Sequence, residues 1–246
     1  MSGVREQVVV GRRASLEAVR AGRALEVLVA QDSRATTPLR EVLEACRRAG
    51  VGVREADRRE LDELGTDHHG VVTRVRPGDE LRERELASWP FGGEDVIVVL
   101  DGITDPQNLG AAARSAEAAG AAMLVSRLRR AAAVSPAAVR ASAGALLHLP
   151  QARVANIPRA LDRLKDGGFF VVGLDGKADR TVYDDPCPAG RVAVVLGSEG
   201  KGLSRLVRET CDALVRLPMR GKVSSLNASA SLAAALYAYV LPSRRA

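Results

Sequence analysis

Polar side chains gather at the start of an otherwise apolar helical segment near the end of the sequence. In "LPMRGKVSSLNASASLAAALYAYVL", residues 217–241, Gly221 predicts a turn, and Ser224, Ser225 and Asn227 come directly before an alanine-rich stretch. One polar side chain is enough to cap a helix. The surplus therefore indicates that this helix start lies beside a binding pocket.

A second polar loop follows an apolar strand in "VAVVLGSEGKGLS", residues 192–204. After the strand come Gly197, Ser198, Glu199 and Gly200, and a helix is expected to begin near Gly202. Backbone N–H groups in such a turn can hold a carboxylate or a phosphate, although Glu199 alone would be an ordinary turn carboxylate. The loop lacks the spacing of a Walker A motif and of a dinucleotide fingerprint. The spacing therefore speaks against a nucleoside triphosphatase and a dinucleotide-dependent oxidoreductase.

A third loop leads into another alanine-rich helix in "LDGITDPQNLGAAARSAEAAG", residues 100–120. Asn108 stands where we expect the helix N-cap, and Arg114 lies among small residues further along. A solvated surface arginine would explain Arg114 equally well. The small neighbours, however, would let a ligand or another backbone come close. A guanidinium at such a place is suited to holding phosphate.

The strands and helices that must position these loops predict an α/β fold. Apolar strands alternate with helical segments from residue 95 onward, which predicts a parallel sheet with helices on both faces. Ligands of such sheets bind at the carboxyl ends of the strands, where the three loops lie. The expected strands occupy residues 95–102, 121–126, 169–176, 191–200 and 212–219.

The first part of the chain has its own alternation of strands and helices. Residues 1–75 predict a small α/β domain, and the charged stretch 76–93, which contains prolines and adjacent glycines, predicts a linker. Residues 94–246 then form the second domain. The chain is thus expected to have two α/β domains.

Composition limits the possible partners and the compartment. The 246 residues carry a net charge of +6, nearly all of it from arginine, which favours a nucleic-acid partner, although a GC-rich genome would also enrich arginine. Aromatic residues make up only 3%, so base stacking should not dominate recognition. Cys46, Cys187 and Cys211 are far apart, which argues against a metal site or a disulfide framework. No apolar run is long enough to span a membrane, and a reduced cytoplasmic setting is expected.

Three motifs together resemble those of the SpoU (TrmH) family. These are "DPQNLGAAARSAEAAG", "LGSEGKGLS" and "LPMRGKVSSLNASASLAAALY", in this order and spacing. The family comprises S-adenosylmethionine-dependent RNA 2′-O-ribose methyltransferases of the SPOUT superfamily. The segments "VVVGRRASLEAV" and "DHHGVVTRV" resemble the opening and closing parts of the small RNA-binding domain found in the branch that methylates a guanosine of 23S rRNA.

The resemblance implies a fold, a cofactor and an assembly. It implies a parallel-sheet SPOUT domain whose C-terminal segment forms a trefoil knot, with S-adenosylmethionine bound in the knot. Gly197, Leu217 and Leu226 match positions that meet the cofactor, largely through backbone atoms. The family usually forms homodimers through helices that flank the knot. The alanine-rich helices at 109–119 and 228–239 would suit this close packing, or could be buried within one subunit.

The resemblance also implies catalytic positions, which are Asn108, Arg114, Glu199, Ser225 and Asn227. The reaction would be methyl transfer to a ribose 2′-hydroxyl, with no metal ion and with 23S rRNA as substrate. An arginine base is one interpretation of Arg114. Because arginine stays protonated in proteins, a clamp for phosphate or for developing negative charge is the alternative that we favour.

Four other functions stay open at this point. The chain could methylate tRNA, or another 23S rRNA nucleotide and thereby confer antibiotic resistance. It could also be a ribosome-associated RNA-binding protein that has lost catalysis, although the intact polar positions argue against this. An oxidoreductase is disfavoured by the missing fingerprint.

Overall fold

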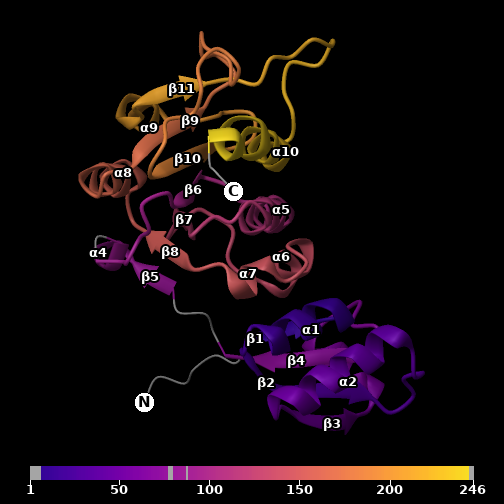
Figure 1. The fold of residues 1–246 in the computed structure, drawn as a ribbon. Coiled ribbons are helices and arrows are strands. Elements are labelled where there is room, and N and C mark those ends of the chain that lie inside the picture. Colours follow the sequence, from indigo (N-terminus) through magenta and orange to yellow (C-terminus); the bar gives the residue numbers. More distant parts are fainter. Residues whose placement is uncertain (1–6, 77–79, 87, 244–246) are drawn as a thin grey trace. The chain divides into compact units, whose positions relative to one another are not determined.

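The chain folds into two compact units, shown in Figure 1. The computed structural model describes residues 7–76, 80–86 and 88–243. The first unit comprises Met1–Gly78 together with Val134–His148, and the second comprises Asp79–Ala133 and Leu149–Ala246. Val134–His148 thus groups with the N-terminal unit, although it follows the third β-strand of the second unit in sequence. The domain boundaries expected from the sequence remain a prediction.

The first unit is built on a four-stranded sheet in the order β1-β4-β2-β3. β1 and β2 each pair with β4 in antiparallel fashion, and β3 pairs with β2 in parallel. Strands and helices alternate in it, as predicted for residues 1–75. They are β1 (Gln7–Val10), α1 (Arg12–Arg20), β2 (Ala24–Ala30), α2 (Thr37–Ala49), β3 (Gly52–Ala56), α3 (Arg58–Leu64) and β4 (Val71–Val75).

Two apolar clusters cover the two faces of this sheet. One joins α1 and α2 to the sheet through residues such as Leu16, Val42 and Val27, and the other packs Leu61 of α3 against Leu28. Local signals fix the long helix α2, because a proline lies in its first turn and Gly50 ends it in the left-handed conformation at φ 66°. These two signals set where α2 begins and where it ends.

The second unit contains a seven-stranded sheet in which every pairing is parallel, as the apolar strands predicted. Its order is β11-β9-β10-β6-β7-β8-β5. The strands are β5 (Glu80–Arg82), β6 (Val96–Asp101), β7 (Met123–Arg127), β8 (Gln151–Val154), β9 (Phe170–Leu174), β10 (Val192–Gly197) and β11 (Ala213–Val215). The sequence did not indicate β5 or β8.

Helices lie between these strands. They are α4 (Glu83–Leu86), α5 (Pro106–Ala118), α8 (Ile157–Asp166), α9 (Arg205–Thr210) and α10 (Ala228–Ala235), while α6 (Pro136–Ala141) and α7 (Ala145–His148) belong to the first unit. α10 continues as a π-helical turn, η1 (Leu236–Val240), and a 3-10 turn, η2 (Leu241–Ser243). α10 packs against α5 (Figure 1), so the two alanine-rich helices contact each other within one chain.

The charged stretch 76–93 contains more structure than a linker would. β5 pairs with β8, and Leu86 of α4 is buried in the core of the second unit. Arg191 donates hydrogen bonds to the carbonyl oxygens of Phe91 and Gly92 at 2.7 and 2.8 Å. The described residues of this stretch from Glu80 onward are therefore packed onto the sheet of the second unit.

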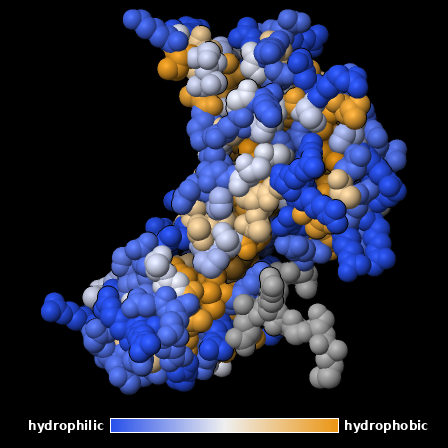
Figure 2. All heavy atoms as spheres, turned by 180° about the vertical axis from the view of Figure 1, so that it is seen from behind, coloured by the Kyte–Doolittle hydropathy of each residue, from blue (hydrophilic) through white to orange (hydrophobic). Residues whose placement is uncertain are grey.

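The carboxyl ends of two central strands lie side by side. β10 pairs with β6 in a register that sets Gly197 opposite Asp101. The loop before α5 and the loop after β10 must therefore start next to each other. Hydrophilic side chains cover most of the face seen in Figure 2, whereas the strands that carry these loops are buried along their whole length.

Candidate active site

The first loop positions Asn108 through a helix cap at Asp105, which differs from the cap that we predicted. Asp105 is the N-cap of α5, and its carboxylate accepts hydrogen bonds from the backbone N–H groups of Gln107 and Asn108. Pro106 occupies the first helical turn, as proline commonly does. The expectation that Asn108 caps the helix was wrong. Because Asp105 does so, the Asn108 side chain is free for contacts elsewhere.

The second loop folds back tightly on the end of β10. Ser198 and Gly202 exchange backbone hydrogen bonds of 3.1 and 2.9 Å across the turn. A Cβ atom on Gly197 would lie 2.2 Å from the carbonyl carbon of Gly202 and 2.3 Å from the nitrogen of Leu203. Only glycine fits this close approach. α9 begins at Arg205, three residues later than expected, and the turn leaves Glu199 exposed.

The third loop ends in Asn227, which caps α10. Its Oδ1 accepts hydrogen bonds from the Ser229 backbone N–H at 2.9 Å, from the Ser229 hydroxyl at 2.6 Å, and from the Ala230 N–H at 3.4 Å. These donors fix the orientation of the amide, so that Nδ2 points away from the helix. One residue therefore both caps the helix and offers two N–H donors to the site.

The three loops meet in a hydrogen-bonded triad of Asn108, Glu199 and Asn227. Glu199 Oε1 accepts from Asn108 Nδ2 at 2.9 Å and from Asn227 Nδ2 at 2.8 Å. Asn227 Nδ2 also donates to Asn108 Oδ1 at 2.9 Å. No described residue forms a hydrogen bond with Glu199 Oε2, which leaves one carboxylate oxygen able to accept from a ligand. The sequence predicted that these residues would share one edge of the sheet, and the structure brings them together.

The other expected catalytic positions lie outside this triad. Arg114 is exposed in the middle of α5, and Ser225 is exposed in the loop before α10. Neither side chain forms a hydrogen bond or an ion pair with any residue in the described part of the chain. The roles of all five residues in catalysis remain predictions.

A partly buried ion pair at the end of β6 was not predicted from the sequence. Asp101 ends β6 and is 3% exposed. Its Oδ1 accepts from Arg127 Nε at 2.9 Å and also from Arg127 Nη2, and its Oδ2 accepts from the Ser204 backbone N–H at 2.9 Å. Asp101 thus ties the end of β6 to the end of the second loop. The sequence signal that could have predicted this contact is an acidic residue, Asp101, at the end of an apolar strand.

The surroundings of the described side chains argue against a nucleophilic role for Cys211 and show no cluster for a metal ion. Burial raises the pKa of Cys211 to about 12, so this thiol stays protonated and is not a nucleophile near neutral pH. Within the described residues, no group of three or more His, Cys, Asp or Glu side chains is placed to hold a metal ion. In the same part of the chain no helix has the length and apolar character needed to cross a membrane.

The positions expected to meet S-adenosylmethionine suit such a ligand. Gly197 permits a turn too tight for any side chain, and Leu217 follows β11 in a half-buried position. Leu226 and its neighbour Val223 are 44% and 66% exposed, which offers apolar surface to a flat ring. Compact backbone beside exposed aliphatic side chains fits the recognition of an adenosyl group.

Comparisons with known proteins agree with this geometry. Residues 95–237 match the model of the SpoU rRNA Methylase family, and residues 8–80 match the model named RNA 2′-O ribose methyltransferase substrate binding. A 23S rRNA (guanosine-2′-O-)-methyltransferase RlmB of Photobacterium profundum is 38% identical over 218 residues, covering 87% of this chain and 88% of the relative. The putative TrmH family tRNA/rRNA methyltransferase YacO of Bacillus subtilis is 37% identical over 234 residues, 93% of each chain.

A solved structure gives the same result. The SpoU methyltransferase AviRb of Streptomyces viridochromogenes, in complex with the cofactor AdoMet, superposes with a TM-score of 0.80 at 31% identity, over 96% of this chain and 90% of that one. The SpoU rRNA Methylase model, which matches residues 95–237, extends over the three loops that form the triad. This chain therefore belongs to the SpoU rRNA methylase family.

Proposed function

We propose that this protein transfers a methyl group to the ribose 2′-hydroxyl of a guanosine in 23S rRNA. The observation that carries the proposal is the Asn108–Glu199–Asn227 triad, which joins three loops that lie far apart in sequence at one edge of the parallel sheet. The RlmB relative is named for this reaction and this substrate. Its rRNA substrate would make the bacterial cytoplasm the place of action.

S-adenosylmethionine supplies the electrophilic methyl group when it is bound. We assign Gly197, Leu217 and Leu226 to holding it, through the tight turn and the aliphatic side chains described above. A trefoil knot of the C-terminal segment is part of the proposal. It is supported by the family membership.

The chain's own polar groups would act on the RNA. The free Oε2 of Glu199 can accept a hydrogen bond, and the two asparagines hold this carboxylate in place through its other oxygen. Arg114 is exposed and has no partner in the described chain, so its guanidinium can hold an RNA phosphate or stabilise charge that develops on the attacking oxygen. Ser225 is close in sequence to the cap residue and is assigned to ordering this loop.

Mapping of 2′-O-methyl groups tests the proposal. We expect one guanosine of 23S rRNA to lose its methyl group when the gene is deleted and to regain it when the gene is restored. The purified protein should methylate the same site in an unmodified transcript. A site in tRNA would favour the second candidate, which the YacO relative's name supports. An unchanged map together with a failure to bind S-adenosylmethionine would refute both.

We further propose that the active enzyme is a homodimer whose sites combine residues of two subunits. Arg114 has no partner among the described residues of its own chain, and apolar side chains such as Tyr237 and Leu226 are 52% and 44% exposed near the alanine-rich helices. In a dimer with twofold symmetry, an arginine that reaches the partner's triad would do so at both sites.

Mixing two inactive variants should restore activity if the site is shared. An Arg114→Ala subunit keeps its triad, and an Asn227→Ala subunit keeps its arginine. Random exchange should give heterodimers with one complete site, and so about one quarter of the wild-type activity. Methyl transfer measured after mixing, with subunit exchange followed by native mass spectrometry, gives the result.

The matched control mixes wild type with the double variant Arg114→Ala/Asn227→Ala. A shared site makes these heterodimers inactive, so activity should fall to about a quarter of that of an all-wild-type sample, whereas sites within single subunits would leave about a half. An active monomer in sedimentation experiments would contradict the dimer proposal directly.

A further inference from the structure

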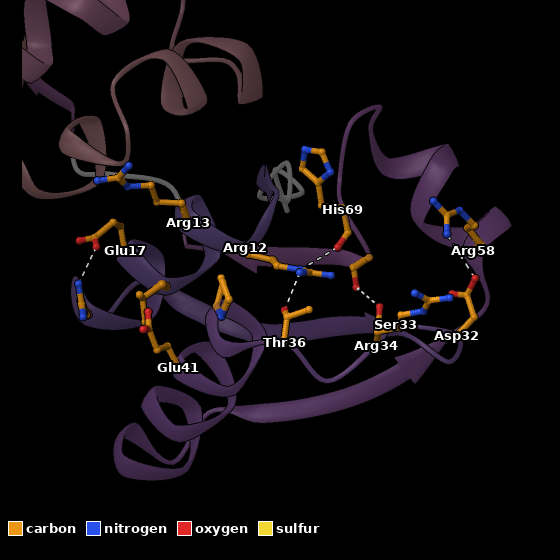
Figure 3. A pocket seen from close by; sticks show the side chains of 14 residues that line it. Arg12, Arg13, Glu17, Asp32, Ser33, Arg34, Thr36, Glu41, Arg58 and His69 are labelled. Carbon is orange, nitrogen blue, oxygen red and sulfur yellow. Dashed lines mark hydrogen bonds and ion pairs between the residues drawn. The ribbon is translucent and has the colours of Figure 1, made fainter.

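An open pocket in the first unit is lined mainly by charged side chains. Its volume is about 1040 Å³, and Leu16 and Pro38 are the large apolar residues in its lining. Pockets for small apolar ligands are about 300–1,000 Å³ and mostly hydrophobic, so this one has the size but not the lining of such a site. Its lining comes from α1, from the starts of α2 and α3, and from the loops after β2 and α3 (Figure 3).

Positive charge dominates this lining. It contains the arginines Arg12, Arg13, Arg20, Arg34 and Arg58 and the carboxylates Glu17, Asp32 and Glu41. Two of the carboxylates are already paired. Glu17 contacts Arg20 at 2.9 Å and His148 at 3.0 Å, and Asp32 contacts Arg58 at 3.3 Å. Arginines therefore remain in excess over the one carboxylate, Glu41, that has no ion pair with a described residue.

Arg12 stabilises the walls of the pocket, because its guanidinium already donates hydrogen bonds within the protein. Its Nε donates to the His69 carbonyl oxygen at 3.0 Å and its Nη1 to the Thr36 hydroxyl at 2.7 Å (Figure 3). The Ser33 hydroxyl donates to the Gly70 carbonyl oxygen at 3.3 Å. Gly70 itself has φ +80°, and a Cβ there would lie 2.2 Å from the Ser33 hydroxyl oxygen. The loops around the pocket are thus held in place before any ligand arrives.

Arg13 and Arg34 are the side chains available to bind. Both are exposed, and neither forms a hydrogen bond or an ion pair with another residue in the described ranges. Figure 3 shows Arg13 to one side of Arg12, and Arg34 to the other side together with Arg58. The guanidinium groups of Arg13 and Arg34 thus lie free on the two sides of the hydrogen-bonded Arg12. This arrangement suits a ligand that carries negative charges at regular spacing.

We propose that this pocket holds the sugar–phosphate backbone of the RNA substrate, with Arg13 and Arg34 each contacting a phosphate and Arg12 positioning the loops between them. The open form of the pocket lets a polymer enter and leave. The planar fork of arginine binds a phosphate through two parallel hydrogen bonds. The inference rests on the proposed function and adds to it the place where the N-terminal unit binds RNA.

A pair of double variants with equal loss of charge tests the proposal in the full-length protein. Arg13→Ala/Arg34→Ala removes the two free guanidinium groups. Arg47→Ala/Arg48→Ala is the matched control, because these two exposed arginines lie in the last turn of α2. Helix geometry puts them on the order of 15 Å from the pocket end of α2. Arg13→Gln/Arg34→Gln keeps most of the side-chain length, should the alanine variant fold poorly.

The readouts are affinity for an unmethylated 23S rRNA transcript at several salt concentrations, and steady-state methylation. We expect the pocket variant to bind RNA about tenfold or more weakly, and the slope of log affinity against log salt to fall in magnitude by about 1.5, since each phosphate contact contributes about 0.7–0.9. KM for RNA should rise, while kcat and S-adenosylmethionine affinity stay unchanged. The control variant should keep the wild-type slope.

Three results would overturn the proposal. They are an unchanged affinity in the pocket variant, an equal loss in the control variant, which would mean diffuse charge attraction, and a fall in kcat without a rise in KM. Wild-type protein that methylates the transcript while the pocket variant binds normally would reject the pocket and leave the methyltransferase function standing. Wild-type protein that neither binds nor methylates RNA would reject the function itself.

Discussion

Replacing Arg114 by alanine is expected to lower the single-turnover rate of methyl transfer by about a hundredfold or more, the effect of losing one preorganised donor at a developing charge. Arg114 is exposed on α5, and the substitution removes no hydrogen bond or ion pair with a described residue. Affinity for S-adenosylmethionine, measured by calorimetry, should barely change. The thermal unfolding midpoint should also stay near that of wild type.

The conservative variant separates two roles for this side chain. Arg114→Lys should restore little activity, because a lysine ammonium is a point charge that cannot form the paired hydrogen bonds of a guanidinium. A true base would behave differently, since lysine can lose its proton when its pKa is lowered and could then support methylation at raised pH. A large loss of cofactor affinity with an unchanged chemical rate would place Arg114 in the cofactor pocket and contradict the assignment.

Adding one methyl group at Gly197 should disable cofactor binding. In Gly197→Ala, the new Cβ would overlap the carbonyl carbon of Gly202 at 2.2 Å and the nitrogen of Leu203 at 2.3 Å. Both neighbours are backbone atoms, so the whole turn from Ser198 must move. We expect S-adenosylmethionine affinity to fall about a hundredfold, which corresponds to about 3 kcal/mol and is typical of forced overpacking.

Gly176→Ala is the matched control for this variant. Gly176 lies in the exposed loop after β9, its Cβ would meet nothing within 4 Å, and its backbone needs no left-handed conformation. Its cofactor affinity should equal that of wild type. Wild-type affinity in Gly197→Ala, with a folded protein confirmed by circular dichroism, would show that the turn can shift freely and does not shape the cofactor site.

The central strands could be predicted because burial on both faces leaves a continuous apolar run. "VIVVLD" and "VAVVLG" are of this kind and became β6 and β10. β5 and β8 escaped notice because "ELR" and "QARV" are short and contain charged or polar residues. β5 lies at the edge of the sheet and β8 is next to it, and edge strands often carry charges. Strands at the centre of the sheet could therefore be predicted from their sequence, whereas the strands at and beside its edge could not.

The sequence predicted which loops would lie together at the candidate site, but not the hydrogen bonds between them. Polar loops that follow parallel strands lie at the same edge of the sheet, and on this ground Asn108, Glu199 and Asn227 were predicted to lie near one another. The helix cap was misassigned because Asn108 seemed suitable by residue type, although Asp105 followed by Pro106 is the better start signal. The brace from Arg12 to His69 joins residues 57 positions apart, and no local pattern encodes such a contact.

Deamidation of Asn227 would change the site at a single atom. Its oxygen receives the first N–H groups of α10 while its nitrogen donates to Glu199 at 2.8 Å, so both ends of the amide are in use. Asparagine is among the residues that heat and age degrade, and deamidation would turn this side chain into an aspartate. The new carboxylate would still cap the helix but would face the carboxylate of Glu199 at hydrogen-bonding distance, and like charges repel. A protein that had aged in this way would keep its fold and its Asn108–Glu199 hydrogen bond, while the loop that ends in Asn227 would be repelled from the other two.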